Sequence, residues 1–95
     1  MTQVPFATRS ERAMNPRKLL KKAVNSPNNL SFADLLALAQ AFGFRLVRVS
    51  GSHHILKHQD IPEQLNVQEV DGKAKAYQVR QLLKIVEEHN FQLGK

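Results

Sequence analysis

The residues best suited to chemistry lie in one short stretch, where Gly51 and Ser52 precede His53 and His54, with a further histidine at position 58. Histidine side chains as a class titrate near neutral pH, so one imidazole can take a proton from a ribose 2′-hydroxyl or give one to a leaving oxygen. Among nucleic acids, only RNA offers that internal nucleophile. Proton transfer of this kind contributes roughly a hundred- to ten-thousand-fold in rate, and cations near the phosphate add to it. Lys57 is the first candidate for such a cation.

The spacing of these histidines argues against a shared metal ion. In an extended strand side chains alternate, so His53 and Lys57 share one face while His54 and His58 share the other. Which face meets solvent is left open by the sequence. His54 and His58 would stand about 13 Å apart along a strand, too far to bind one Zn²⁺. The chain has no cysteine, so a thiolate site is excluded as well. We therefore expect no metal and no other cofactor, and a structural role for His54.

The elements that must position His53 follow from periodicity and capping signals. Asn15 and Pro16 favour a helix start, Ser31 with Asp34 resembles a capping box, and Gly43 suits a helix stop. Apolar residues recur at helical spacing in two further segments, while β-branched and aromatic residues mark three strands. The predicted helices are 15–26, 31–42 and 76–89, and the predicted strands are 44–49, 53–58 and 65–70.

The element order predicts an α+β fold. After an extra short N-terminal helix the order is α-β-β-β-α, which suits a three-stranded antiparallel sheet with two helices on one face. The other face of such a sheet is open to a partner.

Composition and charge indicate the size of the domain and where its basic residues lie. The chain has 95 residues, suited to one domain, and a formal charge of +6. Residues 1–25 carry +5 of this charge and residues 26–95 only +1. We divide the chain into a flexible tail (1–14), a short basic helix (15–26) and one folded domain (27–95). No apolar run reaches the length of a signal peptide or a membrane span, and we expect a cytoplasmic protein with no membrane partner.

Basic residues around the predicted sheet are candidates for phosphate contacts, which attract without reading sequence. Lys73 and Lys75 rank highest because they stand just before the last helix, whose N-terminus favours phosphate. Tyr77 and Phe91 are expected to pack rather than to stack on bases. The full set of candidate RNA-binding residues is Lys57, Arg48, Arg45, Lys73 and Lys75.

The stretch from Gly43 to Ile55 resembles the HicA family of toxins. It has a helix ending in Gly-Phe, a strand carrying arginine, and then Gly51-Ser52-His53-His54 before an aliphatic residue and a later histidine. The resemblance covers roughly residues 31–90. It implies a double-stranded-RNA-binding-domain-like fold and the activity of an mRNA interferase, which is an endoribonuclease acting on mRNA. It also implies a HicB antitoxin as partner, His53 as the catalytic residue, and a turn shaped by Gly51 and Ser52.

Three functions remain open from the sequence. The first is a metal-independent endoribonuclease in a toxin–antitoxin system, with His53 as general acid or base. The second is a catalytically inactive module of the same fold that binds RNA or protein. The third is an adaptor whose basic N-terminal segment, residues 1–25, makes the association.

Overall fold

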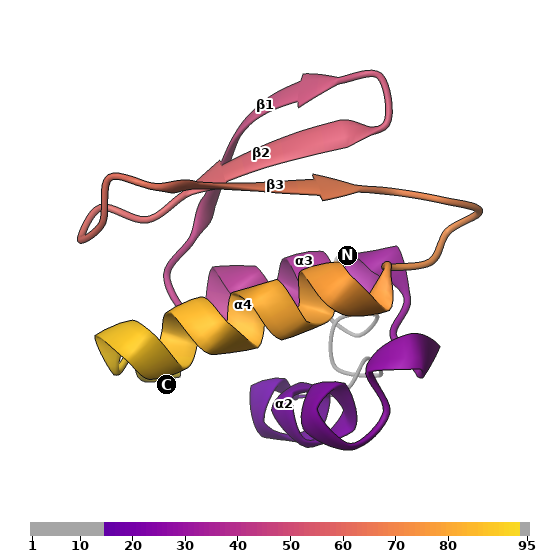
Figure 1. The fold of residues 1–95 in the computed structure, drawn as a ribbon, viewed down its shortest axis with the longest axis horizontal. Coiled ribbons are helices and arrows are strands. Elements are labelled where there is room, and N and C mark those ends of the chain that lie inside the picture. The colour runs from indigo at the N-terminus through magenta and orange to yellow at the C-terminus, as the bar shows by residue number, and fades with distance from the viewer. Residues whose placement is uncertain (1–14, 94–95) are drawn as a thin grey trace, which may run out of the picture.

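The computed structural model describes residues 15–93, and the predicted tail 1–14 lies outside this range. The elements run in the predicted order, and the α+β fold with a three-stranded antiparallel sheet is confirmed (Figure 1). They are α2 (Pro16–Asn25), a 3₁₀ turn η1 (Pro27–Asn29), α3 (Phe32–Ala41), β1 (Arg45–Ser50), β2 (His53–Lys57), β3 (Gln64–Gln68) and α4 (Ala76–His89).

The helix boundaries arise from the caps expected from sequence. The Asn15 side chain accepts a hydrogen bond from the backbone N–H of Lys18 at 2.9 Å, and Ser31 Oγ accepts one from the N–H of Asp34 at 3.0 Å. These side chains satisfy N–H groups that the first helical turn leaves unpaired. After α3 the chain turns at Gly43, whose φ of +102° is accessible to glycine at little cost.

The sheet has the strand order β1-β2-β3, with both pairs antiparallel. The register of β1 on β2 shifts between Leu46 and Arg48, which makes Val47 a bulge. The third strand ends at Gln68, two residues before the predicted end, because the chain then reverses through Asp71 and Gly72 and bridges Val70 to Lys73.

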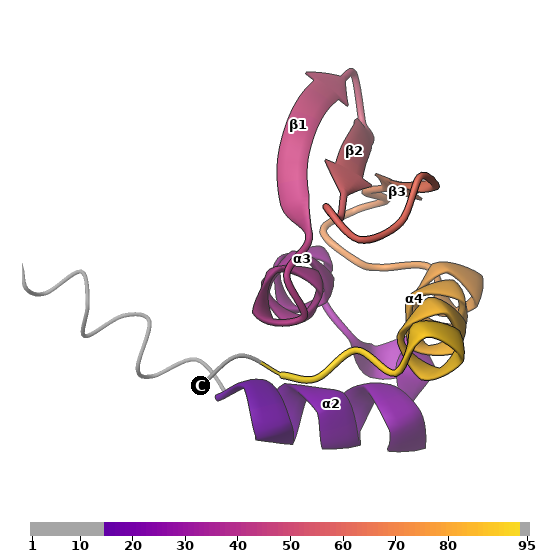
Figure 2. The same cartoon turned by 90° about the vertical axis from the view of Figure 1, so that its left-hand side faces the viewer.

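The molecule is layered, with the sheet on one side, α3 and α4 beneath it, and α2 on the far side of those two helices (Figures 1 and 2). α3 lies under the β1 side and α4 under the β3 side. One face of the sheet therefore packs on helices, and the other carries no described element, as predicted.

The hydrophobic core fills the space between these layers. Leu56, Leu65 and Val67 project from the sheet into it, and Leu35 and Leu82 meet them from the helices. Burial removes apolar surface from water, the main stabilising contribution in a domain of this size.

α2 joins the same core through Leu19 and Ala23, and Lys22 Nζ lies 3.7 Å from the carboxylate of Asp34 on α3. Val24, in the last turn of the same helix, is 60% exposed and does not join the core.

Candidate active site

The open face of the sheet is defined by the strand register. Residues paired across antiparallel strands share a face, and His53 is paired with Ser50 on one side and Gln68 on the other. The face carries three rows of cross-strand neighbours: Ser50, His53 and Gln68; Arg48, Ile55 and Asn66; and Arg45, Lys57 and Gln64. Apart from Ile55, which is buried, its residues are polar or charged, with three cations and no carboxylate. The chain's small net charge outside residues 1–25 therefore hides a local basic surface.

His53 is the first residue of β2 and is exposed at one end of this face. Its Nδ1 lies 3.1 Å from Oδ1 of Asn66, which stands one row away on β3. The turn before it contains Gly51 at φ +61°, with nothing within 4 Å of the place where a Cβ would stand. Glycine is therefore favoured there by backbone conformation and not by space. Gly51 and Ser52 form the turn that leads into His53.

A polar chain connects the His53 row to the start of α4. The Gln68 side chain donates from Nε2 to Ser52 Oγ at 3.2 Å and accepts at Oε1 from Lys75 Nζ at 3.4 Å. Because Gln68 is the cross-strand neighbour of His53, Lys75 is the lysine that these contacts bring to the histidine end of the face.

Next to Lys75 stands an exposed aromatic ring. Lys75 Nζ lies 5.9 Å from the centre of the Tyr77 ring. Tyr77 is 60% exposed, so the prediction that it packs is wrong. Its position in the first turn of α4 puts it outside the apolar stripe of that helix.

Gln78 is a site residue that the sequence analysis missed. It is 4% exposed and caps the outer edge of β3: its Oε1 accepts from Gln68 N–H at 3.1 Å, and its Nε2 donates to Asn66 O at 3.4 Å. One signal was available, since Gln78 stands four residues before Leu82 and thus on the buried side of α4.

The other predicted cations are distributed over the open face and beyond it. Arg48 lies in the middle row, and Arg45 and Lys57 form the row at the far end from His53. Lys57 is four residues from His53 along the strand, about 13 Å at the strand rise. Lys73 stands elsewhere: it lines a separate surface hollow with Ser31 and Asp71.

The two neighbouring histidines have structural surroundings. His54 packs its ring edge-on against Phe32, at 4.7 Å between ring centres, and its Nδ1 donates to the carbonyl of Ser52 at 3.2 Å. His58 is buried, donates from Nε2 to Phe42 O at 3.0 Å, accepts at Nδ1 from Asp60 N–H at 3.0 Å, and stacks on Phe91. Phe91 thus packs as predicted, and the alternation along β2 separates the exposed His53 from these two.

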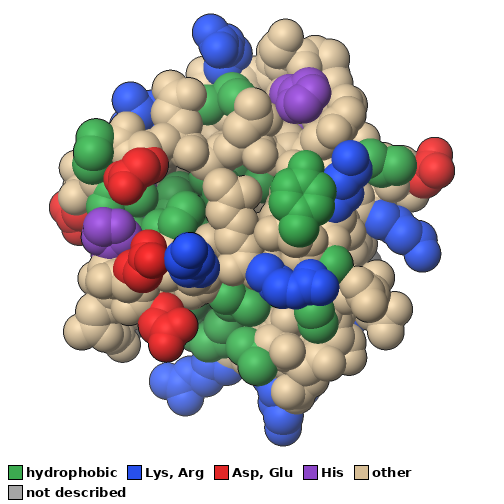
Figure 3. Space-filling view, in the orientation of Figure 1, with side chains coloured by type: hydrophobic (Ala, Val, Ile, Leu, Met, Phe, Trp, Pro, Cys, Tyr) green, Lys and Arg blue, Asp and Glu red, His purple; other side chains and the backbone are tan. Residues whose placement is uncertain are grey.

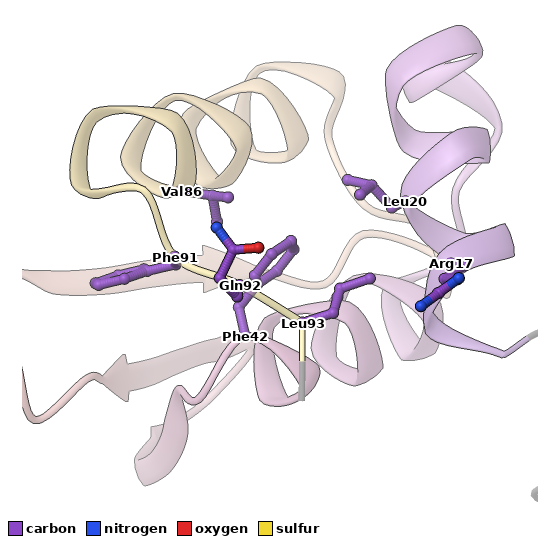
Figure 4. A pocket seen from close by; sticks show the side chains of 7 residues that line it. All are labelled: Arg17, Leu20, Phe42, Val86, Phe91, Gln92 and Leu93. Atoms are coloured by element: carbon purple, nitrogen blue, oxygen red, sulfur yellow. The ribbon is translucent and has the colours of Figure 1, made fainter. Parts of the chain in front are cut away.

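A pocket of about 290 Å³ lies away from the sheet face, between α2, the end of α3 and the segment after α4 (Figure 4). Its lining is mainly apolar, with Leu20, Phe42 and Phe91 on its walls and Arg17 at one side. It contains no histidine or carboxylate, so we do not assign it to the chemistry of His53. Within residues 15–93, no group of three or more His, Cys, Asp or Glu side chains is placed to hold a metal ion.

The charges of the molecule are unevenly spread. In Figure 3, acidic side chains gather mainly over the end where α4 finishes, while the end where α4 begins shows more basic ones. Glu87 and Glu88 lie in the last turn of α4, and Lys75 lies at its start. The start of α4, where Lys75 contacts the Gln68 side chain, is therefore more basic than the end of that helix.

Comparison with known protein families gives a match over most of the folded region. The family model described as the HicA toxin of bacterial toxin–antitoxin systems matches residues 32–88, which run from the first residue of α3 into the last turn of α4. No curated protein matches the chain. No helix among residues 15–93 has the length and apolar character needed to cross a membrane.

Proposed function

Because the chain belongs to the HicA toxin family of bacterial toxin–antitoxin systems, we propose that it is an endoribonuclease that cleaves mRNA without a metal ion. What carries the proposal is His53, exposed on an open and basic sheet face with Nδ1 against Asn66 Oδ1. Among the described residues, no hydrogen bond is made at His53 Nε2. That nitrogen is therefore available to a substrate.

The reaction we propose is an internal transfer at phosphorus. His53 Nε2 accepts the proton of the ribose 2′-hydroxyl, the 2′-oxygen bonds to the adjacent phosphorus, and the bond from phosphorus to the 5′-oxygen breaks. The products are a 2′,3′-cyclic phosphate and a 5′-hydroxyl end. No second histidine stands on the described open face, so the leaving oxygen takes its proton from water.

The cations divide into two roles according to their place on the face. Lys75, joined to the His53 row through Gln68, is the cation for the reacting phosphate, where developing negative charge gains most from a fixed positive group. Arg45, Arg48 and Lys57 bind phosphates further along the RNA and contribute affinity without sequence preference. Lys57 is thereby a binding residue and not the partner of His53 at phosphorus.

A HicB-like antitoxin is the protein partner we propose, and the open face is where it would bind. Covering this face would remove His53 and the three sheet cations from RNA at the same time. Since the face is basic, an antitoxin surface with carboxylates would complement it and would increase the rate of association.

The experiment that tests this function is RNA cleavage in EDTA by the wild type, His53→Ala and the matched control His89→Ala. His89 is an exposed histidine in the last turn of α4, far in sequence from the site. We expect wild type and His89→Ala to produce cyclic-phosphate ends and His53→Ala to lose roughly a hundredfold or more of the rate, with circular dichroism unchanged. RNA binding without cleavage by the wild type would instead favour a binding module without turnover.

A further inference from the structure

We infer that Asn66 is a positioning residue, which holds the His53 ring in the tautomer with the proton on Nδ1 and the lone pair on Nε2. Its catalytic consequence rests on the proposed function, while the tautomer itself is a property of the protein alone. The carrying observation is the 3.1 Å contact between His53 Nδ1 and Asn66 Oδ1. An amide oxygen only accepts hydrogen bonds, so the hydrogen in this contact belongs to the ring.

The acceptor is held in place by the fold and does not depend on a flexible side chain alone. Asn66 lies in the middle of β3, where it is paired with Ile55 of the central strand. Its carbonyl on the opposite edge accepts from the buried side chain of Gln78 at 3.4 Å, and Gln78 also fixes Gln68, two residues further along β3, through its N–H. β3 is thus secured on both edges at Asn66.

Other acceptors near His53 are already engaged. The amide of Gln68, its direct cross-strand neighbour, bonds to Ser52 and Lys75. Asn66 is therefore the side chain in the described sheet that fixes the ring of His53.

Fixing the proton on Nδ1 has a chemical consequence at the other nitrogen. A neutral imidazole carries one proton, and the nitrogen that keeps it is set by the hydrogen bond made there. With Nδ1 donating to Asn66, the lone pair is on Nε2, where it can take the proton of the 2′-hydroxyl. The Nδ1 bond persists when the ring becomes an imidazolium, since both nitrogens then donate. Every proton exchanged with substrate therefore passes through Nε2.

The same molecule contains a histidine held in the opposite form, which serves as an internal reference. His58 accepts from the Asp60 N–H at Nδ1 and donates from Nε2 to Phe42 O, so its proton is on Nε2. The two rings should give opposite patterns of nitrogen chemical shift in one spectrum.

The test combines ¹H–¹⁵N spectra of the ring nitrogens with RNA cleavage for wild type, Asn66→Ala, Asn66→Asp and the control Gln64→Ala. Gln64 is exposed on the same face of the same strand, in the row furthest from His53. The His53 signals are assigned from their absence in His53→Ala.

We expect the wild type and Gln64→Ala to show His53 protonated on Nδ1 and His58 on Nε2. In Asn66→Ala the His53 pattern should move toward the Nε2–H form, and kcat should fall by about three- to tenfold, the range that one neutral hydrogen bond confers.

Asn66→Asp keeps an acceptor and adds a negative charge, which favours the imidazolium. It should keep the Nδ1–H form and move the acidic limb of the cleavage profile to higher pH. The charged groups nearest His53 in the sheet and at the start of α4, Arg48, Glu69 and Lys75, are unchanged in all these variants.

An Nε2–H tautomer in the wild type, or a His53 pattern that is the same in Asn66→Ala, would overturn the inference whether or not the protein cleaves RNA. Failure of the proposed function would give a different result: the wild type would show the expected His53 tautomer but would not cleave RNA.

Discussion

Gly43 and His58 flank the β1–β2 hairpin in the sequence and lie in close contact in the structure. A Cβ added at Gly43 would come within 2.8 Å of His58 Nε2, the nitrogen that donates to the carbonyl of Phe42. The φ of +102° at Gly43 separately disfavours any side chain. Both the close approach of His58 and the positive φ therefore favour glycine at this position, where α3 ends.

We predict that Gly43→Ala lowers the free energy of unfolding by about 3 kcal/mol, through the positive φ and the forced shift of a buried ring together. Gly72→Ala is the matched control, since Gly72 has a φ of +75° and open space where its Cβ would stand. It should lose only about 1 kcal/mol from backbone conformation. Urea unfolding measures both, and equal losses in the two variants would show that the contact with His58 is not costly.

At the residue scale, the sequence predicted which histidines share a face of the strand, but not which face is exposed to solvent. Alternation along residues 53–58 correctly separated His53 from His54 and His58, since the pleat of a strand follows from backbone geometry alone. Which set faces solvent depends on where α3 and α4 pack, a long-range property. The contacts of Lys75 with Gln68 and of His53 with Asn66 join residues of different elements, and no local pattern signals them.

At the scale of elements, α4 does more than cover the sheet. It places the buried Gln78 side chain along β3, where the amide takes the position of a neighbouring strand and satisfies one N–H and one C=O of the edge. Buried polar groups cost free energy when they are left without partners, so this single side chain links helix packing to the strand that carries Asn66.

We predict that Gln78→Leu lowers the free energy of unfolding by about 1–3 kcal/mol, because it leaves the Gln68 N–H and the Asn66 carbonyl without their partner. Hydrogen exchange of the Gln68 amide should become faster by more than global stability accounts for. Gln81→Leu, at an exposed position of the same helix, is the control and should change neither quantity appreciably. Unchanged exchange at Gln68 in Gln78→Leu would contradict the edge-capping role.

The boundaries of most elements were predictable within one or two residues because caps and turns are specified by local sequence. Asn15, Ser31 and Gly43 each stand where a helix starts or stops. The 3₁₀ turn at Pro27–Asn29 and the bulge at Val47 were not predicted. Both depend on how neighbouring elements meet: the turn passes the chain from α2 to α3, and the bulge adjusts the twist of β1 against β2.

At the scale of the whole molecule, the distribution of charged side chains over the surface matters more than the net charge. The open face presents Arg45, Arg48 and Lys57 without a carboxylate among its rows, and acidic residues gather mainly over the end where α4 finishes (Figure 3). An RNA strand is therefore attracted to one surface of a domain whose charges nearly cancel overall, and its affinity should depend on salt accordingly.

We predict that the affinity for unstructured single-stranded RNA falls linearly in a plot of log K against log salt. Arg45→Gln combined with Lys57→Gln should reduce the slope by about 1.4, which is about 0.7 for each phosphate that the variant no longer neutralises. Fluorescence anisotropy on the His53→Ala background avoids cleavage. Lys84→Gln, an exposed substitution on α4, is the control and should leave the slope unchanged. An equal reduction by Lys84→Gln would place the RNA elsewhere.

The two edges of the sheet differ in a way that limits how copies of this protein can assemble. The edge of β3 is occupied by Gln78, whereas no described strand pairs with the outer edge of β1, whose residues Leu46, Val47 and Val49 are exposed. A filament grown head to tail by strand addition needs two free edges on each subunit. Because Gln78 occupies part of the β3 edge, strand addition is favoured at β1, where antiparallel pairing of two copies is self-complementary and ends at a closed dimer.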